Sequence, residues 1–219
     1  MTVAEIFSKG GIVVWILFGY SIIAVTLLLE RFLNFALLTR PPRGFEAQLL
    51  AAMRAGSSEE LLQPLRGPEV NIVRGMLEAA SLGARDLARV ASRIGSEELQ
   101  QMERGFRTLG VLGNTAPLLG LFGTITGMIK AFMVIEHAGG KVDAQALAGG
   151  IWEAMLTTGV GLAVAIPILL MLHMLEGMAG RRAQAMRRSA SVVLEQTQSA
   201  GQGGEVEMVD AREGVAHAV

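Results

Sequence analysis

A carboxylate and two hydroxyls lie close together at the start of a long uncharged stretch. Glu153 comes first, Thr157 follows about one helical turn later, and Thr158 is next to it. Residues 154–175 contain no Asp, Glu, Lys or Arg, so a helix here is long enough to cross a bilayer. A carboxylate near a membrane interior is costly and normally faces protein or a water-filled cavity. Two interpretations of Glu153 therefore stand: an anchor at the outer headgroups, or a residue that lines a passage.

A second apolar stretch, at 108–135 with Lys130 near one end, offers a matching hydroxyl. Counted at 1.5 Å per residue, Thr124 lies about eleven residues from the outer end of this stretch, and Thr158 about eight from the outer end of its own. Both therefore fall near the middle of the bilayer. A single membrane Thr usually bonds its own backbone, so each hydroxyl alone indicates packing. Their similar depth favours one polar level built from two helices.

Small residues and prolines interrupt both stretches. Four glycines have the spacing of close helix packing: Gly120, Gly123, Gly127 and Gly161. Pro117 and Pro167 each leave one carbonyl without its helical donor and are expected to bend their helices. Such kinks either shape the packing or open a passage between helices.

Composition limits the class of protein. The chain is 51% hydrophobic and 18% charged, which is typical of membrane helices, and its net charge of −1 provides no basic field for nucleic acid. Cysteine is absent and the three histidines are far apart in sequence, so we expect no metal site and no cofactor. An enzyme is a rival class. Its candidate pair, Glu153 and His173, would lie about 30 Å apart on one helix, so we expect no enzyme.

Arginines set the predicted orientation. Residues 30–107 hold eleven Arg and no Lys, four more Arg follow the third span, and the segment between the second and third spans holds only Lys130 and Lys141. Because cytoplasmic flanks are rich in Arg and Lys, the N-terminus is predicted to be periplasmic and the C-terminus cytoplasmic. A cleaved signal peptide is the alternative for the first span. Its apolar run is too long, and no small-residue cleavage site follows.

The predicted organisation is all-α, with three membrane spans. In chain order it comprises a periplasmic tail (1–9), a span (10–29), a cytoplasmic helical domain (30–107), a span (108–135), a periplasmic loop (136–150), a span (151–175), a cytoplasmic helical extension (176–199) and a disordered, Gly-rich tail (200–219).

Local signals refine the cytoplasmic parts. The "TRPPRG" stretch (39–44) is expected to end the helix that leaves the first span, and a Gly-Ser break is expected at 56–58. Residues 85–107 lead straight into the second span, and only Gly95 and Gly105 interrupt them, so one long helix is expected over 85–135. The charges of the helical extensions are expected to lie on a solvated helix face.

Three stretches resemble a known family. "APLLGLFGTITGMIKAF" (116–132) and "GIWEAMLTTGVGLAVAIP" (150–167) resemble the two signature helices of the MotA/TolQ/ExbB proton-channel family, and "LLLERFL" (27–33) resembles the exit of its first span. The resemblance covers residues 5–180. Three spans and a glutamate at position 153 are more similar to the ExbB and TolQ types than to MotA, with ExbB favoured. "MLHMLEG" (171–177) departs from the usual tyrosine-asparagine of the family.

The resemblance implies a function. Such proteins form a homo-pentamer in the bacterial inner membrane. Their second and third spans line a central pore, which holds a dimer of a single-span ExbD- or TolR-like partner. Thr124 and Thr158 match the pore threonines of the family, Glu153 matches its pore-facing glutamate, and Thr157 is placed in the same proton pathway. Proton flow would drive a TonB- or TolA-like transducer for outer-membrane uptake. The alternatives are a TolQ-like subunit of the Tol-Pal envelope system, a scaffold that conducts nothing by itself, and sodium in place of the proton.

Overall fold

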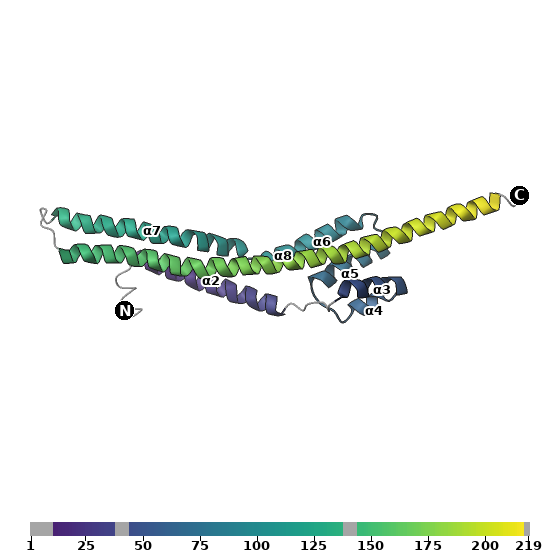
Figure 1. Cartoon of the computed structure of the whole chain (residues 1–219), viewed down its shortest axis with the longest axis horizontal. Coiled ribbons are helices and arrows are strands. Elements are labelled where there is room, and N and C mark those ends of the chain that lie inside the picture. The colour runs from purple at the N-terminus through teal and green to yellow at the C-terminus, as the bar shows by residue number, and fades with distance from the viewer. Residues whose placement is uncertain (1–10, 38–43, 138–143, 217–219) are drawn as a thin grey trace. The chain divides into compact units, whose positions relative to one another are not determined.

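The computed structural model describes residues 11–37, 44–137 and 144–216, and all the regular structure within these ranges is α-helical (Figure 1). In this part of the chain, three helices are long and apolar enough to cross a membrane: α2 (Gly11–Leu37), α7 (Phe106–His137) and α8 (Ala144–Ala216). The predicted all-α membrane fold is therefore confirmed. Apart from Gly10, which lies outside the described residues, the three expected spans fall within these helices.

Four shorter helices complete the described chain: α3 (Phe45–Ala55), α4 (Ser58–Leu62), α5 (Pro68–Ser81) and α6 (Leu87–Glu103). The expected break at 56–58 is confirmed, because Gly56 ends α3 with a φ of 72° and its backbone N–H bonds the last carbonyls of that helix. The chain divides into two compact units. The first holds α2, α7 and α8 as far as Gly177, and the second holds α3 to α6 and the remainder of α8.

The first unit is built on three helices that share a small apolar core. Val13 and Leu17 of α2 meet Ala116 of α7 and Ala165 of α8, and all four are buried. In Figure 1, α2 and α7 both run along the first part of α8. The large apolar side chains that these helices do not bury point outward; Phe122, for example, is 56% exposed. Such a surface suits contact with lipid or with other membrane helices.

The second unit is fixed by a buried ion pair. Glu69 lies in the first turn of α5, directly after Pro68, and its side chain is only 2% exposed. Both of its carboxylate oxygens accept hydrogen bonds from Arg182 Nη1 of α8, at 2.9 and 3.1 Å. The expectation that the charges of the helical extensions lie on a solvated face is therefore wrong for Arg182. It holds for Arg188, whose side chain is 65% exposed.

The single long helix expected over 85–135 is wrong. The α6 helix ends at Glu103 and α7 begins at Phe106, with Gly105 between them at a φ of 88°. Glycine adopts this left-handed conformation without the steric penalty of a side chain, and it commonly ends helices in this way. A glycine that looked tolerable inside a helix therefore acts as a helix terminator.

The ends of the remaining elements differ in part from expectation. The α7 and α8 helices extend into the predicted 136–150 loop, to His137 and from Ala144. The α8 helix continues past Gly180, as predicted, and then through Ala216, whereas the composition of 200–219 favours disorder. Most of the "TRPPRG" break lies outside the described residues. The α2 helix ends at Leu37, just before it.

Candidate functional site

The α7 and α8 helices meet along a seam of small residues. A Cβ on Gly120 would lie 3.0 Å from the Thr157 carbonyl oxygen, and a Cβ on Gly161 only 2.7 Å from the Ala116 carbonyl oxygen. The same holds toward the outer end, where a Cβ on Gly127 would lie 3.1 Å from the Cβ of Ala154. The predicted glycines thus occupy the closest approach of two antiparallel helices, where backbone meets backbone.

Two hydroxyls of α8 converge on one carbonyl of α7. Thr158 Oγ1 donates to the Gly120 carbonyl oxygen at 3.1 Å, and Thr157 Oγ1 lies 3.4 Å from the same oxygen. Thr157 also donates to the Ala154 carbonyl at 2.8 Å. It is 2% exposed. Thr157 is therefore a packing residue of the seam in this chain, and its burial does not support its predicted place in the proton pathway.

Thr124 does not join this group. Its hydroxyl donates to the Leu121 carbonyl of its own helix, as Thr126 does to the Gly123 carbonyl. Because Gly120 packs at Thr158 and Gly127 packs at Ala154, Thr124 lies about one helical turn nearer the outer end than Thr158. The predicted common level is therefore right to within about one turn, but the two hydroxyls do not bond the same group.

Glu153 faces α2. Its Oε1 would lie 3.4 Å from a Cβ on Gly11, the first residue of that helix. Glu153 is partly buried, and its carboxylate has no hydrogen bond or ion pair within residues 11–37, 44–137 and 144–216. Lys130, near the outer end of α7, makes no ion pair with Glu153. Because successive helical residues turn by about 100°, Glu153 is rotated about 140° from Thr158.

Thr124 and Thr158 lie on the same edge of the α7–α8 seam, opposite the edge that faces α2. The α2 helix packs on the edge that carries Leu119 of α7 and Val160 of α8. Thr124 and Thr158 are partly exposed, and by helical rotation both lie on the edge away from α2. The structure therefore separates the predicted site into two parts: a threonine edge, defined by Thr124 and Thr158, and Glu153 on the α2 side.

The prolines do not end their helices. Pro117 lies inside α7 and Pro167 inside α8, and both helices continue on either side. Each proline lacks the N–H that would bond the carbonyl four residues earlier, which leaves the carbonyls of Gly113 and Ala163 without that donor. These carbonyls are additional polar groups in otherwise apolar segments.

No metal-binding cluster is evident in the part of the chain that the structure describes. Within the described ranges, no three His, Cys, Asp or Glu side chains gather as metal ligands would. Glu153 and His173 lie on the continuous α8, so their separation remains about 30 Å. They cannot act on one substrate.

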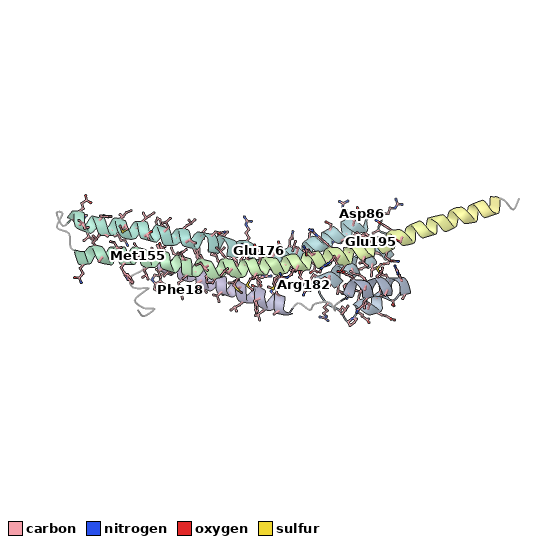
Figure 2. The ribbon with its side chains drawn as sticks, viewed as in Figure 1. Phe18, Asp86, Met155, Glu176, Arg182 and Glu195 are labelled. Atoms are coloured by element: carbon pink, nitrogen blue, oxygen red, sulfur yellow. The ribbon has the colours of Figure 1, made fainter. Side chains whose placement is uncertain are left out.

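Two further polar residues, His173 and Glu176, lie on the threonine edge. From the sequence alone, only His173 is singled out, as half of a candidate catalytic pair. His173 is exposed on α8, 15 residues after Thr158, which corresponds to four turns and a rotation of about 60°. Glu176 lies 18 residues after Thr158, or five full turns of about 3.6 residues, and so has the same rotation as that threonine. Figure 2 labels Glu176 on α8. Counting helical turns from Thr158 would have found both residues in the sequence.

Three apolar helices, a glycine seam and threonines at mid-span define an integral membrane protein whose polar groups lie between helices. The model of the MotA/TolQ/ExbB proton channel family matches residues 66–188. The chain belongs to this family. This membership agrees with the resemblance drawn from the sequence.

Relatives with ExbB names support the same placement. The chain is 30% identical to the "Putative biopolymer transport protein ExbB homolog" of Methanothermobacter thermautotrophicus, over 77% of this chain and 61% of that protein. It is 33% identical to "Putative biopolymer transport protein ExbB-like 1" of Synechocystis sp., over 77% and 68% of the two chains. It is 32% identical to "Biopolymer transport protein exbB1" of Vibrio cholerae, over 72% of each. The match thus spans about three fifths of the methanogen protein.

Proposed function

We propose that this chain is the ring subunit of a proton-driven motor in the bacterial inner membrane. Five copies would surround a dimer of an ExbD-like single-span protein, and proton flow through the ring would drive work passed to TonB for outer-membrane uptake. The N-terminus would be periplasmic and the C-terminus cytoplasmic, as the arginine-rich flanks favour. The ExbB names of the relatives favour this assignment over a TolQ-like subunit that serves the Tol-Pal system.

One observation carries the proposal: Thr124 and Thr158 lie together on the edge of the α7–α8 seam away from α2. A ring that places α2 outermost would turn this edge toward its centre. Hydroxyls at mid-span on that side would give a proton-carrying partner polar groups in an otherwise apolar wall. The glycine seam supports the same arrangement, because it holds both helices in one fixed rotation.

Glu153 takes a place at the outer mouth in this proposal. Its carboxylate lies beside the start of α2, about five residues outward from Thr158 along α8. There it can attract protons toward the passage without facing the same way as the threonines. The chain itself supplies hydroxyls and one carboxylate at this depth, so the proton carrier within the ring would be a carboxylate of the partner.

The test measures function and assembly together. Thr124→Ala, Thr158→Ala and Glu153→Ala are each expected to impair TonB-dependent uptake while oligomer size stays unchanged. Normal uptake and normal envelope constriction in all three variants would contradict the pore assignment. Normal uptake together with a defect in envelope constriction would instead favour the TolQ-like alternative. Assembled rings without any proton flux would favour the scaffold.

A further inference from the structure

We propose that His173 is the proton acceptor at the inner end of the passage, releasing protons to the cytoplasm beside Glu176. The inference rests on the proposed function, because it concerns the exit of the same pathway. It adds a role to a residue at which this sequence departs from the usual tyrosine-asparagine of the family.

The position of His173 supports this role. His173 follows Leu172, whose Cδ2 lies 3.6 Å from the place of a Cβ on Gly110, so the contact between α7 and α8 reaches this level. His173 itself is exposed on α8. Its rotation differs by about 60° from that of Thr158, and it lies roughly 22 Å further along the helix toward the inner end. It therefore lies on the same edge as the threonines, about half a bilayer deeper.

The hydrogen bond of His173 fixes which ring nitrogen can accept a proton. Nδ1 lies 2.7 Å from the Leu169 carbonyl oxygen. A carbonyl oxygen only accepts, so Nδ1 carries the hydrogen in the neutral ring. Nε2 then holds the free lone pair, at the exposed end of the side chain. An imidazole with one free ring nitrogen can accept a proton and release it again, which suits this point of the passage.

The charged groups around His173 complete the exit. Glu176 follows three residues later on α8, within reach of the same helix face. On α7, Asn114 and Arg107 are exposed and lie within about 100° of the rotation of Thr124. On the other side of the seam, α2 places Arg31 beside Gly105, where Arg31 Nη2 bonds Glu30 at 2.8 Å. Glu30 is thus on the α2 side of the seam, and the carboxylate on the same side as His173 is that of Glu176.

The proposed step is a simple proton transfer. Nε2 takes a proton from a hydronium ion in the passage through its lone pair, which gives an imidazolium and leaves a neutral water molecule. The imidazolium then loses the same proton to cytoplasmic water or to the Glu176 carboxylate, which restores the neutral ring. No redox partner takes part.

Thiol labelling tests the placement without relying on conduction. The chain contains no cysteine, so single-cysteine variants carry one label site each. Met174 is the matched control: it is 62% exposed and turned about 160° from Thr158. In intact rings, a water-soluble thiol reagent added from the cytoplasmic side should label His173→Cys about tenfold faster than Met174→Cys, because the first faces water and the second lipid. Equal rates would overturn the placement.

Proton flux tests the role. In vesicles that contain the ring with its single-span partner, His173→Ala should slow proton flux about tenfold or more, because a positioned proton acceptor contributes at least that much in enzymes. Imidazole added on the cytoplasmic side should restore the flux of His173→Ala and leave Thr158→Val unchanged. If proton flux is unaltered in His173→Ala but slowed in Thr158→Val, the role of His173 is overturned and the pore assignment stands. Unaltered flux in both variants would overturn the pore as well.

Discussion

The Thr158 hydroxyl donates a hydrogen bond across the α7–α8 seam to the Gly120 carbonyl oxygen, 3.1 Å away. This bond ties a residue of the proposed passage to the point where the two helices come closest. Because Gly120 has no side chain, the two backbones can approach closely, and its carbonyl oxygen comes within hydrogen-bond distance of the Thr158 hydroxyl. Rotation of the threonine edge is therefore set by packing, so changes to the seam should alter the passage.

The seam should not tolerate a methyl group at its centre. Gly161→Ala would place a Cβ 2.7 Å from the Ala116 carbonyl oxygen, a backbone atom that cannot move alone. We expect a loss of about 1–3 kcal/mol in the free energy of unfolding, as for other overpacked sites. Gly159→Ala is the matched control, because nothing lies within 4 Å of its Cβ. Thermal unfolding of both variants in detergent measures the difference, and equal melting temperatures would contradict the seam.

The buried ion pair of the second unit should be the costliest charge to remove. Glu69→Ala leaves Arg182 with a 12% exposed side chain and without this carboxylate, so we expect a loss of about 3–5 kcal/mol. Glu46→Ala removes the partner of the exposed Arg188 and should cost less than about 1 kcal/mol. Denaturant unfolding of the full chain compares the two variants. Similar losses would show that the burial of Glu69 does not matter.

The break between α6 and α7 should depend on the left-handed conformation of Gly105. With a φ of 88°, Gly105→Ala should cost about 1–2 kcal/mol, because a Cβ is unfavourable in this conformation. Gly105→Asn should cost less, since Asn tolerates the left-handed region better than Ala. Gly180→Ala, inside α8 and with open space around it, should instead stabilise the chain slightly. If Gly105→Ala and Gly105→Asn had melting temperatures close to each other and to that of the wild type, the left-handed conformation at this position would not be required.

The spans and the seam could be predicted from the sequence because they depend on local signals. Runs without charge give span length, and small residues at helical spacing give close packing. Thr124 and Thr158 were identified by counting residues, and the helical rise is constant enough for that count to hold to about one turn. The family resemblance then supplied the partners and the oligomer, which a single chain does not contain.

The remaining features depend on contacts between distant residues. Glu69 and Arg182 are 113 residues apart, and nothing near either of them in the sequence shows that they meet. The direction of Glu153 depends on where α2 begins, and the break at Gly105 depends on a backbone conformation that any helical pattern would hide. Each was misjudged or left open because helical periodicity describes one helix at a time.

The most direct test of the threonine edge is proton flux through two variants of α7 that differ in the direction they face. Thr124 and Thr126 are two residues apart, and both donate to the carbonyl three residues earlier, but Thr126 is turned about 160° away from Thr124. In vesicles that hold the ring and its single-span partner under a fixed proton gradient, Thr124→Val should slow proton flux at least about tenfold and Thr126→Val should leave it unchanged. Equal flux in the two variants, whether fast or slow, would contradict the account.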